Sequence, residues 1–160
     1  MTPFIIDSSI LIDLHRTQPK EITIYAKLWK NLEDSMRDGD ILISEEVYFE
    51  LTRGEDDLSI WIKDMRLFYP TAFIESNSRV QQKVVEVMAR CQSLVDPDSD
   101  KNHADPFLVA VGILTNGIVV CSESPRKQKD QRCKVPDACE EFGIKCIKYL
   151  DFAKLFTWVV

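Results

Sequence analysis

Four acidic residues stand where α/β proteins gather catalytic side chains. Asp7 directly follows a short apolar run, and Glu123 follows another such run by two residues. Asp105 opens an apolar helical segment, and Glu50 lies on a predicted helix that follows a further apolar run. Ligands of open parallel sheets bind outside the carboxyl ends of the strands, so we expect these four carboxylates to meet at one edge.

Carboxylates without a clustered His or Cys partner suit hard divalent cations. Mg²⁺ and Mn²⁺ prefer oxygen ligands, keep several waters and bind phosphate oxygens. A cation held in this way turns bound water into a nucleophile and stabilises the charge that develops on a phosphodiester. The four acids therefore predict metal-assisted phosphodiester chemistry, with Mg²⁺ or Mn²⁺ as the cofactor.

Each acid also has an ordinary structural interpretation. Asp7 suits the N-cap of a short helix, and Asp105 followed by Pro106 is typical of a cap with proline in the first turn. Glu50 suits a solvated helix position, and Glu123 suits a loop. Taken singly, these interpretations are favoured. Taken together, they require four coincidences at one edge of a sheet, which favours a shared site.

The segments that must position these acids alternate between strands and helices. Five short apolar runs predict strands, and their continuous rather than alternating character predicts burial on both faces. These strands are residues 4–6, 41–43, 71–74, 118–121 and 144–149. Apolar spacing and end signals predict helices between them. The predicted helices are residues 8–14, 21–37, 44–53, 58–68, 79–95, 106–114, 135–142 and 151–158.

This alternation predicts the fold class. Strands buried on both faces need helices on both sides, which gives a three-layer α/β/α sandwich with a mainly parallel central sheet. The chain has 160 residues, a length that suits one core, and it contains no repeat or linker. We therefore expect residues 1–160 to form a single domain.

Charge is distributed unevenly along the chain. The net charge is −6, but residues 1–125 carry −9 and residues 126–160 carry +3. The acidic balance excludes a protein that coats nucleic acid by bulk attraction. The basic segment is either a solvated loop or a phosphate contact, and the sequence leaves both open. Its candidate substrate-binding residues are Arg126, Lys127, Lys129, Arg132 and Lys134.

Cysteine usage and hydropathy bear on the compartment. The five cysteines are odd in number and contain no C-x-x-C pair, so neither a disulfide framework nor a zinc knuckle is indicated. The most apolar later stretch, residues 107–121, is too short and too interrupted to cross a bilayer. The N-terminus has no basic region of a signal peptide. We expect a cytoplasmic protein without a membrane segment.

The acids lie in segments that resemble the PIN domain family, in particular VapC-type toxin ribonucleases. Residues 4–13, FIIDSSILID, resemble the first strand and turn of that family. The segment from Ile43 to Gly54, with Glu50 before Leu51 on a helix, is similar to its second motif. Residues 104–110 look like the third motif, and residues 119–123 like the fourth. Residues 143–147 look like the last strand. The match runs nearly end to end and in the expected order.

The resemblance implies a PIN-like fold and a set of roles. Asp7, Glu50, Asp105 and Glu123 would be the catalytic and metal-binding acids, and Ser9 would hold the Asp7 carboxylate or a metal-bound water. The family hydrolyses RNA to leave a 5′-phosphate and a 3′-hydroxyl. The implied substrate is single-stranded RNA or a tRNA loop. The implied protein partners are a small antitoxin that occludes the acids and a second copy in a homodimer.

Two departures keep a second hypothesis open. Cys121 and Glu123 stand where the family usually has Thr and Asp, and Pro106 follows the third acid. These changes favour, as the alternative to an endoribonuclease, a catalytically weak PIN-like module that binds a protein partner. An aspartyl-nucleophile phosphatase is disfavoured, because that chemistry needs an acid where Ser9 stands. A Ser-His-Asp hydrolase is disfavoured too, since there is no nucleophile elbow.

Overall fold

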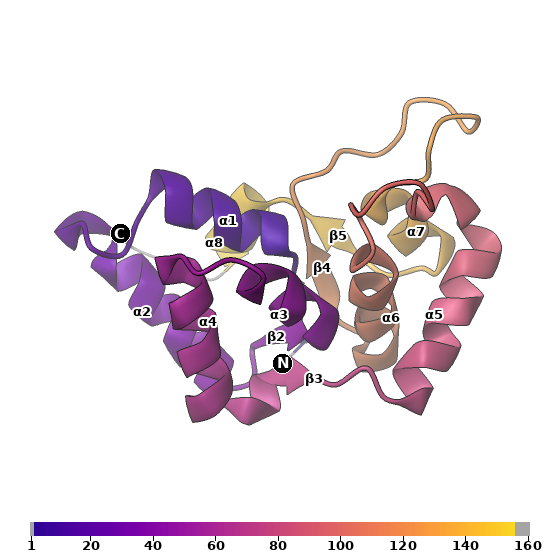
Figure 1. Ribbon diagram of the computed structural model, residues 1–160. Coiled ribbons are helices and arrows are strands. Elements are labelled where there is room, and N and C mark those ends of the chain that lie inside the picture. The colour runs from indigo at the N-terminus through magenta and orange to yellow at the C-terminus, as the bar shows by residue number, and fades with distance from the viewer. Residues whose placement is uncertain (1, 156–160) are drawn as a thin grey trace.

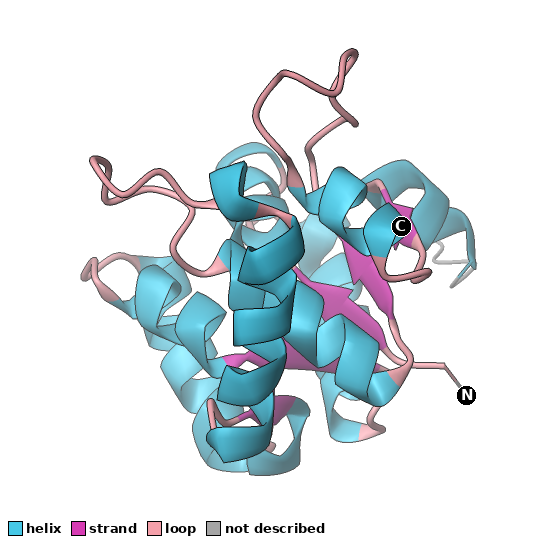
Figure 2. Ribbon diagram, turned by 90° about the vertical axis from the view of Figure 1, so that its right-hand side faces the viewer, coloured by secondary structure: helices cyan, strands magenta, loops and turns pink. Residues whose placement is uncertain are grey.

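The computed structural model describes residues 2–155. A five-stranded parallel sheet lies at the centre, in the order β3-β2-β1-β4-β5. The strands are β1 (Phe4–Ile6), β2 (Ile41–Ser44), β3 (Phe73–Ile74), β4 (Ile118–Val120) and β5 (Cys146–Ile147). Figure 2 shows these strands side by side behind one layer of helices.

Helices cover both faces of the sheet, as Figure 1 shows. One layer holds α1 (Ser8–Thr17), α2 (Thr23–Arg37), α3 (Glu45–Thr52), α4 (Asp57–Phe68) and α8 (Tyr149–Leu155). The other layer holds α5 (Ser78–Arg90), α6 (Asp105–Thr115) and α7 (Val135–Glu141). Two 3₁₀ turns, Pro70–Ala72 and Gln92–Leu94, complete the described elements. The predicted three-layer α/β/α fold is confirmed.

The central strand explains why both faces must be covered. Phe4 and Ile6 of β1 pack into the core under α1 and α2, whereas Ile5 packs into the core under α5 and α6. Side chains alternate across a strand, so a run of three apolar residues places side chains in the cores on both faces of the sheet. This arrangement puts Asp7, the next residue, at the carboxyl edge between the two layers.

Some helices and strands begin or end at residues other than those predicted. The long helix ends at Arg90 rather than at Val95, and a 3₁₀ turn follows. The predicted strand 144–149 is two residues long, and Tyr149 begins α8 instead. The predicted last helix ran to Trp158, and that end lies outside residues 2–155. Asn116 takes a left-handed conformation (φ 50°), which ends α6 and turns the chain into β4.

No helix within residues 2–155 is both long enough and apolar enough to cross a membrane.

Candidate functional site

Asp7 is held at the carboxyl end of β1. Its backbone N–H donates to the Val120 carbonyl at 3.0 Å, which ties the residue to β4. Asp7 precedes α1 in an extended conformation, but its side chain makes no capping hydrogen bond. The carboxylate instead accepts from Ser9 Oγ at 2.6 Å and from Ser8 Oγ at 3.5 Å. The cap interpretation therefore does not account for this side chain.

Asp105 reaches the same edge from α6. It is the first helical residue, with Ala104 at the N-cap position, so the alternative N-cap interpretation of Asp105 is wrong. Its side chain is buried, and its Oδ2 has no hydrogen-bond partner among residues 2–155. A buried oxygen left unpaired costs free energy, so this atom suits a ligand that the chain itself does not supply.

Glu50 joins the site from α3 through Ser8. Ser8 Oγ donates to Glu50 Oε1 at 2.9 Å, so this one hydroxyl contacts Glu50 and also approaches Asp7. Ser8 was not among the site residues predicted from the sequence. The only signal was its place between Asp7 and Ser9, which does not show which way either hydroxyl points.

Glu123 approaches from the loop after β4 and is paired with Arg132. Arg132 Nη2 lies 3.2 Å from Glu123 Oε2, and Arg132 Nη1 donates to the Leu94 carbonyl at 2.9 Å. The guanidinium thus fastens the basic segment to the rim of the site. Arg132 was predicted to bind substrate, and in this structure its guanidinium pairs with Glu123.

The four acids share one electrostatic environment. Burial, together with repulsion from Glu50 and Glu123, raises the pKa of Asp7 from 3.8 to about 6 against the opposing hydrogen bonds of Ser9 and Ser8. Burial, followed by repulsion from Asp7, Glu123 and Glu50, raises the pKa of Asp105 from 3.8 to about 8. Such shifts arise where like charges and low polarity combine, and for Asp105 the nearby positive charge of Arg132 opposes them only in part.

The donor set fits a hard divalent cation, although the site is open. Four carboxylates from four segments supply oxygen only, which is what Mg²⁺ and Mn²⁺ prefer. The unpartnered Oδ2 of Asp105 gives a specific place for an ion to bind. Yet within the described chain no three His, Cys, Asp or Glu side chains are close enough to form a ready-made cage. Glu50 and Glu123 are held instead by Ser8 and Arg132.

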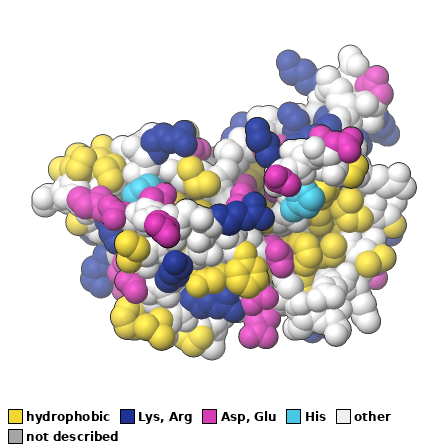
Figure 3. Space-filling view, viewed as in Figure 1, with side chains coloured by type: hydrophobic (Ala, Val, Ile, Leu, Met, Phe, Trp, Pro, Cys, Tyr) yellow, Lys and Arg dark blue, Asp and Glu magenta, His cyan; other side chains and the backbone are white. Residues whose placement is uncertain are grey.

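Two surface features flank the acids. A pocket of about 400 Å³ runs along α3 to the loop before α6 and is lined in part by Glu50, Arg53 and His103. The loop after β4 protrudes from the molecule (orange in Figure 1), and Lys and Arg side chains gather on it in Figure 3.

The predicted basic residues do not all lie in one environment. Lys127 and Lys129 are exposed on the protruding loop. Arg126 Nη1 donates to the Gln131 carbonyl, and the backbone N–H groups of Arg126 and Lys134 donate to the carboxylate of Asp137. These contacts brace the loop itself. Of the five, only Arg132 forms an ion pair with one of the four acids.

Cys121, which stands where the family usually has Thr, is buried beside the site. Its Sγ lies 3.4 Å from Cys146 Sγ, and all five cysteines are free thiols. Hydrogen bonding to Cys146 and burial raise the pKa of Cys121. A thiol that stays protonated is a poor nucleophile, so Cys121 is a buried core residue rather than a reacting group.

Replacing Arg132 by Ala is expected to destabilise the protein. The change removes a charged hydrogen bond to Leu94 and the positive charge that lowers the pKa of Asp105. We expect a loss of about 1 kcal/mol, or a melting temperature lower by roughly 2–4 °C. Thermal unfolding in EDTA at pH 8 measures it, with Lys129→Ala as the control. Equal melting temperatures for the two variants would contradict this role.

Two solved structures share the fold of this chain at low sequence identity. A chain of DNA-bound VapBC from Salmonella typhimurium matches with a TM-score of 0.55 and 13% identity, covering 92% of this chain and 98% of that one. A chain of VapBC2 from Rickettsia felis, bound to a DNA fragment from their promoter, matches with a TM-score of 0.50 and 14% identity, covering 91% and 98%.

These structural matches confirm that the fold is PIN-like. A search of curated proteins found no match. A family model described as "Domain of unknown function (DUF4411)" matches residues 4–159, nearly the whole chain. The chain therefore belongs to the DUF4411 family.

Proposed function

We propose that the chain is a metal-dependent endoribonuclease that hydrolyses phosphodiester bonds in single-stranded RNA or a tRNA loop. The observation that carries this proposal is the pair Asp7 and Asp105. Both carboxyls are buried at the carboxyl edge, the charge of Asp7 raises the pKa of Asp105, and Asp105 Oδ2 has no hydrogen-bond partner among residues 2–155. Buried acids arranged in this way are typical of functional sites. The PIN-like fold supports the same conclusion.

The proposed role of each residue follows from its place in the site. Asp7 and Asp105 would hold Mg²⁺ or Mn²⁺, with Glu50 and Glu123 at the margin of the site. The bound ion supplies an activated water and stabilises the charge on the phosphodiester. Ser9 orients Asp7 Oδ2, and Ser8 holds Glu50 close to Asp7. The proposed products carry a 5′-phosphate and a 3′-hydroxyl.

The proposed setting is a toxin–antitoxin pair in the cytoplasm. Support comes from the PIN-like fold and from the two structural neighbours, both described as VapBC. The proposed partners are a small antitoxin that covers the acids and a second copy of this chain. Ile60, Leu67 and Phe68 are exposed on α4, and such apolar surface suits a contact between copies.

RNA cleavage with defined ions tests the proposal. The purified protein is incubated with mixed single-stranded RNA in Mn²⁺, in Mg²⁺ or in EDTA, and the new ends are analysed. We expect internal cuts that leave 5′-phosphates when either ion is present, and none in EDTA. Cleavage that persists in EDTA, or ends that carry a 2′,3′-cyclic phosphate, would refute the metal-dependent mechanism.

A second candidate, a PIN-like binding module without strong activity, is favoured by one observation. Arg132 already neutralises Glu123, and no three acids within residues 2–155 form a closed cage. Such a module would bind a protein partner through the same edge. It predicts no RNA cleavage under any ion, so the experiment above separates the two candidates.

A further inference from the structure

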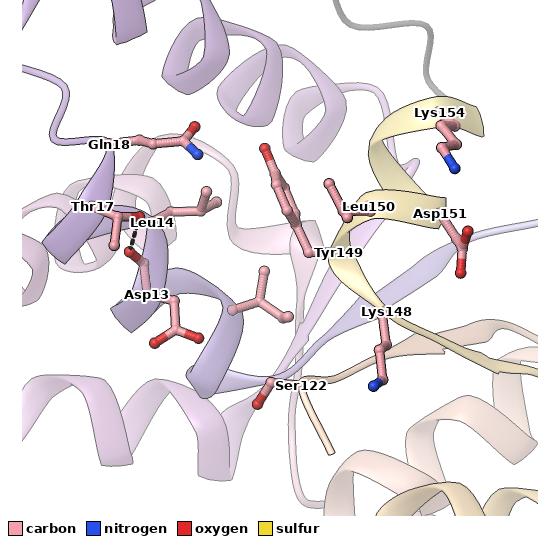
Figure 4. Close-up of a pocket in the computed structure, with 11 residues that line it drawn as sticks. Asp13, Leu14, Thr17, Gln18, Ser122, Lys148, Tyr149, Leu150, Asp151 and Lys154 are labelled. Carbon is pink, nitrogen blue, oxygen red and sulfur yellow. Dashed lines mark hydrogen bonds between the residues drawn. The ribbon is translucent and has the colours of Figure 1, made fainter. Parts of the chain in front are cut away.

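A pocket of about 410 Å³ lies between α1 and α8, beside the acidic site. Figure 4 shows Asp13 and Leu14 entering it from α1, Tyr149 and Leu150 from α8, and Ser122 from the loop after β4. A volume of this size falls within the range of about 300–1,000 Å³ that is usual for small-ligand pockets.

The pocket and the acids share the same elements. Ser9, which donates to Asp7, stands one helical turn before Asp13, so both lie on one face of α1 about 6 Å apart along the axis. Ser122 lines the pocket and immediately precedes Glu123. The pocket therefore borders the acidic site along α1 and along the loop after β4.

The walls are apolar and include a fixed aromatic ring. Ile10 and Leu14 are buried on the α1 side, and Tyr149 is half-buried on the α8 side. The Tyr149 ring packs against Phe152 with centroids 6.4 Å apart, and Phe152 packs edge-on against Phe4 of β1 at 5.1 Å. A braced aromatic ring offers a stacking surface for a planar ligand.

Charged groups of both signs border these walls. Asp13 lies on the α1 side, and Lys148, Asp151 and Lys154 lie on the α8 side. None of the four forms an ion pair within residues 2–155, and Lys148 Nζ donates to Ser124 Oγ at 2.7 Å. Because no opposite charge within residues 2–155 pairs with them, these side chains are available to a ligand.

This combination fits a nucleotide better than a peptide side chain. An apolar side chain would contact the walls. It would also cover Asp13 and the two lysines without offering them a hydrogen-bonding or charged partner, which costs free energy. A nucleotide uses all three features: its base stacks, its amino groups donate to the carboxylate, and its phosphates attract the lysines.

We propose that this pocket holds one unpaired nucleotide of the RNA substrate, with Asp13 selecting guanine. The inference rests on the proposed ribonuclease function and extends it to sequence preference. Guanine presents N1–H and an N2 amino group together to one carboxylate, whereas uracil presents a single N3–H. Guanosine nucleotides should therefore bind more tightly than uridine nucleotides.

Binding of nucleoside monophosphates tests the pocket without relying on cleavage. Guanosine 5′-monophosphate or uridine 5′-monophosphate is titrated into ¹⁵N-labelled protein in EDTA, and amide resonances of α1 and α8 are followed. We expect the guanosine nucleotide to shift them at lower concentration. Asp13→Asn should weaken that binding about tenfold and weaken uridine binding less, because uracil offers only its N3–H, whereas the control Asp64→Asn, on the exposed face of α4, should change neither.

The outcomes separate the pocket from the ribonuclease function. Equal binding of the two nucleotides, or no effect of Asp13→Asn, would overturn the assignment even if RNA is cleaved. No shift in α1 and α8 with either nucleotide would also overturn it and would favour a protein side chain as the occupant. Guanosine-selective binding without RNA cleavage would support the pocket and count against the proposed function. Tyr149→Leu, which keeps an apolar wall, should weaken both nucleotides by loss of stacking.

Discussion

Replacing Asp7 by Asn is expected to lower Mn²⁺-dependent RNA cleavage by about 100- to 1,000-fold. The amide keeps the size of the side chain and can still accept from Ser9, but it removes the negative charge at the centre of the site. Losing several kcal/mol of charge stabilisation corresponds to a rate loss of this order. Initial rates on a labelled single-stranded RNA measure the effect.

The control for this change is Asp64→Asn. Asp64 is an exposed acid on α4, away from the acidic edge, so its loss should leave the rate unchanged. Far-UV circular dichroism of both variants checks that the fold is intact. An Asp7→Asn protein that is folded and cleaves at the wild-type rate would show that the four acids are not the active site.

Replacing Asp105 by Asn is expected to stabilise the metal-free protein at alkaline pH. Asp105 has a folded-state pKa of about 8 against an ordinary value of 3.8, so folding favours its protonated form. The stability that this gives is full below about pH 4 and is lost as the pH rises through 8. Asn carries no charge that would repel its neighbours, so the variant does not lose this stability as the pH rises.

The melting temperatures of wild type and Asp105→Asn in EDTA measure this effect. We expect the melting temperature of the variant to increase relative to that of the wild type as the pH rises from 5 to 9. The difference should be about 5 °C or more at pH 9. Asp7, with a pKa of about 6, causes a similar loss of stability at lower pH in both proteins. A difference that is constant with pH, or a variant that is less stable at pH 9, would contradict the assigned repulsion.

Much of the fold was predictable because its signals are local. Phe4–Ile6 and Ile41–Ile43 are continuous apolar runs, and their burial between two helical layers follows from that pattern. The place of Asp7 and Asp105 at one edge follows in turn from strand order and parallel direction. The parallel direction and the shared carboxyl edge were predictable from the sequence, whereas the strand order comes from the structure.

The contacts that decide the character of the site were not predictable. Arg132 meets Glu123 only because the loop after β4 folds back and is held by the Leu94 carbonyl, a contact 38 residues away in the chain. The two-residue strand β5 and the start of α8 at Tyr149 depend on packing against β4 and Phe4, rather than on local propensity. Long-range placement of this kind leaves no periodic signal.

Proton release on Mn²⁺ binding tests the central claim most directly. At pH 7 the Asp105 carboxyl, with its pKa of about 8, holds a proton that a bound cation must displace. Calorimetric titration in two buffers of different ionisation enthalpy should show Mn²⁺ binding with release of about one proton per ion. Both binding and release should be lost when Asp7 and Asp105 are replaced together by Asn. No Mn²⁺ binding by the wild type, or binding that the double variant retains, would contradict the account.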